Sequence, residues 1–178
     1  MHFGGILPNY QDLLAIFERM KLEWSVERKA IHFGRECPFL LKCCIFDGIA
    51  DDVAIDDIPS SAYELVTLWR ISGRADLFKD VGFGQWGIEV LPPREAVEAT
   101  LKQKRIRGRE FLDGDVVFAR FYGDSELLLM DSEGAVYVSL PLDERCNWPR
   151  VADSLKIFLE KLVDHQGAKY WDGPKGVS

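Results

Sequence analysis

Three glycines near the middle of the chain, Gly82, Gly84 and Gly87, have the spacing G-x-G-x-x-G of a dinucleotide-binding loop. That chemistry requires a strand before the glycines and a helix after them, because the N–H groups of the helix N-terminus bind the pyrophosphate. Here a strand-like run at residues 88–91 and two prolines follow the glycines. The pattern therefore predicts a tight turn that leads into an edge strand, and no cofactor is expected.

Sulfur and imidazole groups are the next candidates for chemistry. His32 lies near three cysteines in the sequence, Cys37, Cys43 and Cys44. Neighbouring cysteines rarely both bind one tetrahedral ion, and no C-x-x-C pair is present, so no metal site is expected. A nucleophilic thiol at Cys43 or Cys44 is not expected either, because burial in an apolar run raises a thiol pKa. We predict that these cysteines pack in the core.

Three closely spaced carboxylate pairs occur, Asp113/Asp115, Asp124/Glu126 and Asp131/Glu133. Acid–base catalysis would need two carboxyl groups in one pocket with well-separated pKa values. All three pairs lie where turns are expected, and aspartate favours turns because its side chain bonds the backbone nearby. The pairs therefore predict turns, and we expect no catalytic residues and no enzyme activity.

A basic run extends from Lys102 to Arg109 at the end of an expected helix, where cations are stabilised by the helix dipole. The chain of 178 residues has a formal net charge of -7, which disfavours binding to nucleic acid or anionic lipid. No export signal and no membrane span are recognised, so we expect reduced cysteines and a cytoplasmic protein without a membrane partner.

The expected helices follow from caps and apolar spacing. Asn9 is expected to cap a first helix, and Ser60 or Ser61 a second one with Glu64 at capping-box spacing. Pro92-Pro93 begins a third helix. A closing helix is predicted at residues 151–163, with Pro149 in its first turn.

The expected strands lie mainly between the third helix and the last. Residues 115–121, 125–131 and 135–140 predict three consecutive antiparallel strands, the last two joined by a Ser-Glu-Gly turn at Gly134. The pattern therefore predicts an α+β fold, an antiparallel meander covered by helices. Residues 25–46 fit either a strand or a helix turn, and residues 47–57 predict an acidic loop.

An ordered set of motifs resembles the SUKH superfamily, the Smi/Knr-type family of cell-wall regulators and bacterial immunity proteins. The motifs are the Ile58-Pro59 helix to Gly73, the glycine-rich turn before Ile88-Glu-Val-Leu91, the Gly123-Asp…Tyr137 hairpin and the helix at Val151-Ala-Asp-Ser-Leu. The resemblance implies one domain over residues 1–178, with a recognisable core at 58–163, a divergent part at 1–57 and a tail at 164–178. Ser72-Gly73 replaces the family's Asn-Gly.

The resemblance also implies a function. Bacterial members commonly bind and neutralise a cognate protein toxin, often a nuclease or a deaminase, and fungal members act as regulatory scaffolds. Gln85, Trp86, Asp124 and Glu126 are the expected partner-binding residues, because aromatic rings supply anchor area and carboxylates supply steering. A regulatory adaptor and a small-molecule-binding protein are the alternatives. The tail is expected to be weakly ordered, although Tyr170 and Trp171 can dock.

Overall fold

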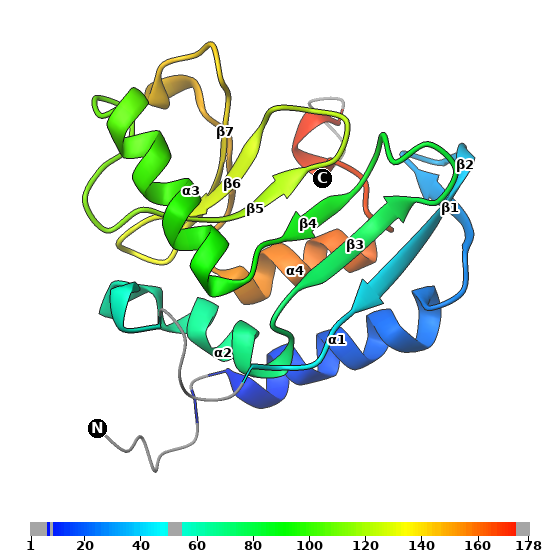
Figure 1. The fold of residues 1–178 in the computed structure, drawn as a ribbon. Helices are drawn as coiled ribbons and strands as arrows, with labels where there is room; N and C mark the ends of the chain where they lie inside the picture. Colours follow the sequence, from blue (N-terminus) through cyan, green and yellow to red (C-terminus); the bar gives the residue numbers. More distant parts are fainter. Residues whose placement is uncertain (1–6, 8, 50–54, 174–178) are drawn as a thin grey trace.

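A computed structural model describes residues 7, 9–49 and 55–173 of the chain (Figure 1). The expectations for part of the acidic loop and for the end of the tail lie outside these residues. The strands are β1 (Arg28–His32), β2 (Arg35–Ile45), β3 (Ala75–Asp80), β4 (Ile88–Val90), β5 (Val116–Phe121), β6 (Leu127–Met130), β7 (Val136–Ser139) and β8 (Arg150–Ala152). The helices are α1 (Tyr10–Trp24), α2 (Tyr63–Ile71), α3 (Pro93–Ile106) and α4 (Leu155–Asp164).

The eight strands form one open sheet in the order of the sequence, and every neighbouring pair is antiparallel. The expected α+β class and antiparallel meander are therefore confirmed. The sheet is larger than the three predicted strands, because β1, β2, β3 and β8 join it. β4 lies between β3 and β5, so the expectation that it forms an edge strand is wrong.

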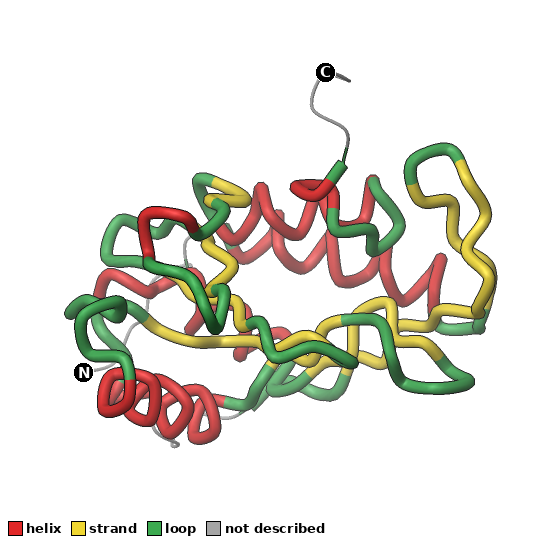
Figure 2. Tube along the Cα trace, turned by 90° about the horizontal axis from the view of Figure 1, so that it is seen from above, coloured by secondary structure: helices red, strands yellow, loops and turns green. Residues whose placement is uncertain are grey.

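Helices cover both faces of the sheet. α3 lies on one side of the strands, and α1 and α4 lie on the other (Figures 1 and 2). The main core fills the side of α1, α2 and α4, and includes Phe17, Leu77 and Phe158. A smaller cluster around Phe111 and Trp148 packs beside α3. No helix in the described part of the chain has the length and apolar character needed to cross a membrane.

The closing helix begins later than predicted. Val136 of β7 pairs with Ala152, so residues 150–152 form strand β8 where the apolar spacing had predicted the first helical turn. Ser154 is the N-cap of α4, because its hydroxyl accepts a hydrogen bond from the N–H of Ile157 at 3.2 Å. Pro149 precedes the strand, and its carbonyl accepts from the N–H of Val138 at 3.0 Å.

Asn9 is the N-cap residue of α1, as predicted, but neither it nor Ser60 or Ser61 forms the expected side-chain cap. Glu64 does not close a capping box in its own helix; its buried carboxylate accepts from the N–H groups of Leu155 at 3.3 Å and Lys156 at 3.4 Å. Glu64 thus stabilises the positive N-terminus of α4. Asn9 has a positive φ of 59° and caps no helix with its side chain, which instead donates to Glu64 at 3.3 Å. The carboxylate of Glu64 thereby joins the starts of α1, α2 and α4.

Candidate functional site

A pocket of about 210 Å³ lies at one end of the central strands β4 and β5, in the corner where three segments meet. Its walls come from the β3–β4 loop, from the turn between β5 and β6, and from the end of α4 with the chain that follows. We call it the corner pocket, and its lining includes Gln85, Trp86, Phe121, Asp124, Lys169 and Trp171.

The β3–β4 loop is held rigid by one buried carboxylate. Asp80 is 2% exposed, and its side chain accepts from the N–H groups of Gly82 at 3.0 Å, Phe83 at 3.2 Å and Gln85 at 3.3 Å. The fingerprint glycines therefore form a tight turn, as predicted, although a strand does precede them. Phe83 stands on this turn with 81% of its surface exposed. The loop presents an apolar ring on a preorganised backbone.

The β5–β6 turn touches the β3–β4 loop through a glycine. Gly123 has a φ of +74°, and a Cβ at this position would lie 2.4 Å from the backbone oxygen of Gln85. Only glycine permits both this conformation and this approach. The Oδ1 atom of Asp124 accepts from the N–H of Glu126 at 2.9 Å, which is the turn role that the sequence predicts.

Lys169 joins the two carboxylates of that turn. Its Nζ atom donates to Asp124 at 2.8 Å and to Glu126 at 3.0 Å, and it lies 4.6 Å from the ring centre of Phe121. Burial lowers the pKa of Lys169, but the two carboxylates outweigh that effect and raise it above its usual value. Burial raises the pKa of Asp124, and the hydrogen bonds from Lys169 and Glu126 hold it below its usual value. Lys169 and Asp124 are therefore both charged at neutral pH.

The structure brings the four expected partner-binding residues to one corner. Gln85, Trp86 and Asp124 line the corner pocket, and Glu126 binds the lysine that also lines it. Sequence reasoning missed Lys169, which comes from the segment that was expected to be a weakly ordered tail. No spacing pattern relates Lys169 to Asp124, because 45 positions separate them.

Residues 165–173, which we call the C-terminal segment, lie against both edges of the sheet. Gln166 accepts from the N–H of Ile31 in β1 through its side chain at 2.8 Å. The hydroxyl of Tyr170 donates to the carbonyl of Val151 in β8 at 2.6 Å. Trp171 packs its ring against Phe121, with 5.9 Å between centroids. The segment thus contributes one wall of the pocket and fixes its position relative to the strands.

The loop and the C-terminal segment also meet through Trp86 and His32. The indole N–H of Trp86 donates to the carbonyl of Gly167 at 3.0 Å. The ring of His32 lies 5.5 Å from that of Trp86, and its Nε2 atom contacts the carbonyl of Gln166 at 2.9 Å. Because a carbonyl only accepts, Nε2 carries the proton in this contact.

Sequence reasoning also missed a thiol–imidazole contact. The Sγ atom of Cys37 lies 3.0 Å from Nδ1 of His32, and with Nε2 protonated the thiol is the donor. Burial raises the pKa of Cys37 and lowers that of His32, so both groups are neutral at neutral pH. Burial raises the pKa of Cys43 to about 12, as expected for an inert core thiol. Among the described residues, no three His, Cys, Asp or Glu side chains group as a metal site.

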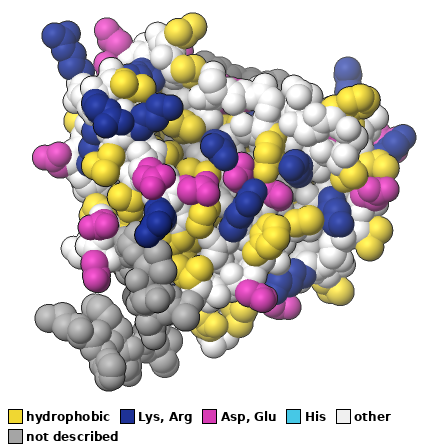
Figure 3. Space-filling view, in the orientation of Figure 1, with side chains coloured by type: hydrophobic (Ala, Val, Ile, Leu, Met, Phe, Trp, Pro, Cys, Tyr) yellow, Lys and Arg dark blue, Asp and Glu magenta, His cyan; other side chains and the backbone are white. Residues whose placement is uncertain are grey.

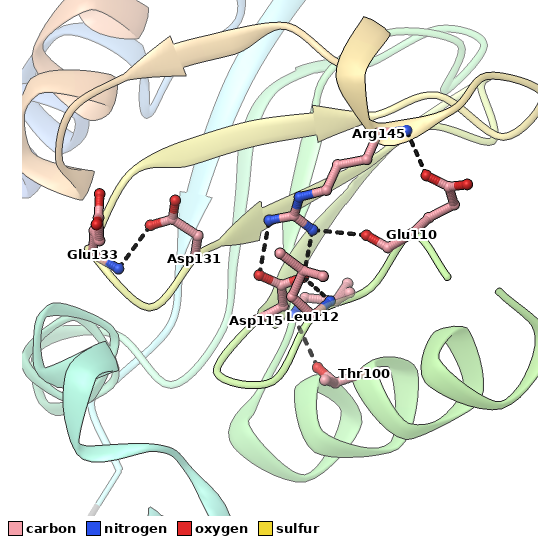
Figure 4. Close-up of polar contacts among 8 residues, drawn as sticks. Thr100, Glu110, Leu112, Asp115, Asp131, Glu133 and Arg145 are labelled. Carbon is pink, nitrogen blue, oxygen red and sulfur yellow. Dashed lines mark hydrogen bonds and ion pairs between the residues drawn. The ribbon is translucent and has the colours of Figure 1, made fainter. Parts of the chain in front are cut away.

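A second cation centre lies beside α3 (Figure 4). Arg145, in the β7–β8 connection, donates to Asp115 through two guanidinium nitrogens at 2.6 and 3.1 Å. It also donates to the backbone carbonyl of Glu110 at 2.8 Å, and its guanidinium lies 5.5 Å from the ring centre of Trp148. We call this the Arg145 centre. It attaches the connection to the start of β5.

The sheet face beside α3 carries a network of paired charges. In Figure 3 acidic and basic side chains mix across the middle of this face. Arg120 donates to Glu89 through two nitrogens at 3.0 and 3.1 Å, and Arg74 lies 3.4 Å from the same carboxylate. The hydroxyl of Tyr122 donates to Asp76. The Arg120–Glu89 pair stabilises the sheet, because these opposite charges face each other on the neighbouring strands β5 and β4.

The corner pocket thus combines the partly buried rings of Trp86 and Trp171 with the carboxylate of Asp124 and the ammonium of Lys169. Comparisons of the chain with protein-family models, with curated proteins and with solved structures found no match.

Proposed function

We propose that this protein is a non-enzymatic binding protein, an immunity protein of the SUKH type that neutralises a cognate toxin by direct contact. The observation that carries the proposal is the β3–β4 loop, which forms one wall of the corner pocket and exposes an aromatic ring. There Phe83 is 81% exposed, although the loop beneath it is held by three hydrogen bonds to the buried Asp80. An exposed aromatic ring on a rigid backbone loses little entropy on binding.

The charge of the chain supports the same function. A net charge of -7 attracts a basic partner and speeds encounter. Nucleases and deaminases that act on nucleic acid need basic surfaces to hold phosphate groups. An acidic protein that covers such a surface competes with the substrate. A stable complex would bury roughly 1,600 Å², so the corner supplies the centre of the interface and neighbouring loops supply its rim.

The test is to determine whether a neighbouring gene encodes a toxin domain and to co-express the full chain with that domain. We expect protection of the host cell and co-purification of the two proteins. Phe83→Ala should weaken the complex by at least about tenfold, because central aromatic anchors carry much of the binding energy. Leu142→Ala is the matched control, since Leu142 is 96% exposed on another loop. If the unmodified chain gives no protection and does not co-purify with the toxin domain, the proposal is rejected.

A small-molecule-binding protein remains the second candidate, because the corner pocket contains both aromatic rings and charged groups. Its volume of about 210 Å³ is below the roughly 300–1,000 Å³ of most ligand sites. Mass spectrometry of the natively purified protein tests it. A small molecule that is bound at one copy per chain and covers the indole of Trp86 would favour this candidate over the toxin-binding function.

A further inference from the structure

We propose that the corner pocket is the receptor for an arginine side chain of the partner, which would bind with its guanidinium between the aromatic walls and the carboxylates of Asp124 and Glu126. This inference rests on the proposed protein-binding function and names the chemistry of the anchor. Three observations lead to it: the cation that already lies in the pocket, the balance of charge and the shape of the walls.

The pocket already accommodates a cation from the chain itself. The ammonium of Lys169 lies 4.6 Å from the ring centre of Phe121 and 5.9 Å from that of Trp86. A cation near an aromatic face is attracted to the electron density of the ring. Only 17% of the Lys169 side chain is exposed, so this contact forms within the pocket wall. The walls are therefore chemically suited to a positive group.

The local charge favours a second cation. Asp124 and Glu126 contribute two negative charges and Lys169 contributes one positive charge, so this ion-paired group of three residues has a net charge of -1. The side chains of Asp124 and Glu126 are 30% and 21% exposed, so an incoming group can reach their oxygens. An anion would meet like charge from both carboxylates, which excludes a phosphate or carboxylate as the preferred occupant.

The shape of the pocket distinguishes a guanidinium from an ammonium. Trp86, Trp171 and Asp124 line the pocket. A planar guanidinium can stack on an indole ring, and a carboxylate offers acceptors for its fork of N–H groups. An ammonium is more strongly hydrated and does not stack. The volume of about 210 Å³ suits one side chain better than a peptide segment.

The experiment uses N-acetyl-arginine amide as the probe, with the uncharged isostere N-acetyl-citrulline amide and with N-acetyl-lysine amide as comparisons. Binding to the full chain is followed at low salt by the NMR shifts of the tryptophan indole N–H groups. We expect Trp86 and Trp171 to shift while Trp148, at the Arg145 centre, does not. The arginine probe should bind at least about fivefold more tightly than the citrulline probe.

Variants distinguish a binding role from a structural one. Asp124→Asn removes one charge but keeps the oxygen that accepts from Glu126, and we expect arginine binding to weaken about threefold. Asp131→Asn is the matched control: Asp131 makes the same kind of turn contact, with Glu133 N–H at 2.9 Å, at the other end of β6. Lys169→Met changes the charge of this group from -1 to -2 and should strengthen arginine binding. If Lys169 were purely structural, its loss would weaken arginine binding.

Equal affinity for the arginine and citrulline probes would overturn the proposal. So would equal affinity for the lysine and arginine probes, or a weaker affinity for the arginine probe after Lys169→Met. These outcomes are separate from the toxin test. If the arginine probe binds as expected but the toxin domain neither co-purifies nor is neutralised, the assignment of the pocket stands and the proposed toxin partner is rejected.

Discussion

Two cations of this protein, Arg145 and Lys169, both lie against carboxylates and aromatic rings, but their partners differ in exposure. The two cationic side chains are buried alike, at 19% and 17% exposed. Asp115, the partner of Arg145, is only 1% exposed, whereas Asp124 and Glu126 are 30% and 21% exposed. The Arg145 centre therefore encloses its carboxylate, and the corner pocket leaves its carboxylates accessible to solvent.

The difference separates an enclosed ion pair from one whose carboxylates are accessible. Arg145 forms a planar, two-nitrogen contact that fixes both partners in one geometry, and no solvent can replace it around Asp115. Lys169 is a point charge on a flexible side chain, and water or another cation can take its place. We infer that the Arg145 centre maintains the fold and that the corner pocket is the part of the molecule available to a partner.

The largest expected effect is that of Arg145→Met. The substitution leaves the carboxylate of Asp115 buried without its cation, which should lower the free energy of unfolding by about 3–5 kcal/mol. Urea denaturation followed by tryptophan fluorescence measures it. A decrease in unfolding free energy below about 1 kcal/mol would mean that the carboxylate of Asp115 becomes hydrated easily in the variant. The distinction between the two centres would then disappear.

Arg145→Lys should have an intermediate effect. It keeps the positive charge but replaces the two-nitrogen contact with a single ammonium, so a loss of about 1–3 kcal/mol in unfolding free energy is expected. The same urea titration measures it. Full recovery of stability by lysine would show that charge alone matters at Asp115 and that planar geometry contributes nothing.

Lys169→Met should destabilise the protein least among the charge variants. Its carboxylate partners are already partly hydrated, so the expected loss is at most about 1 kcal/mol, and added salt should reduce it further. Urea titrations at low and high salt test this. A loss as large as that of Arg145→Met would identify Lys169 as part of the folding core and would argue against an accessible pocket.

The smallest expected effect is a dependence on pH near the corner pocket. Burial lowers the folded-state pKa of His32 below its unfolded value of about 6.5. The unfolded chain then binds more protons, so stability should fall as the pH drops from about 7 through 6.5 toward the folded pKa. NMR of the folded protein should show the Trp86 indole shifting as the pH falls through the folded pKa of His32, below 6.5, while the Trp148 indole does not. His32→Gln should remove the pH dependence, and its persistence would point to another group.

The polar residues of the corner were partly predictable. Aromatic and acidic residues at turns favour recognition, which predicts a partner-binding role for Gln85, Trp86, Asp124 and Glu126. The structure places these residues at one corner, and the binding role stays a prediction. Lys169 was not predictable, since its contacts with the carboxylates span 43 and 45 positions of sequence. The contact of His32 with Gln166 spans 134 positions and was missed for the same reason.

Short-range interactions alone determine several elements, without contacts between distant segments. The β6–β7 hairpin was predicted because Gly134, with a φ of +86°, and Asp131, which accepts from two nearby N–H groups, define the turn within five residues. α3 begins at Pro93, where a missing N–H costs nothing. Each of these features depends only on neighbours in the chain.

Packing between distant segments decides the rest. Residues 150–152 have the apolar spacing of a helix, yet they become β8 because β7 offers unpaired backbone groups beside them. Glu64 has the spacing of a cap for its own helix but stabilises α4 instead, because the folded chain brings those N–H groups to its carboxylate. Such contacts join residues far apart in sequence, so neither periodicity nor spacing records them.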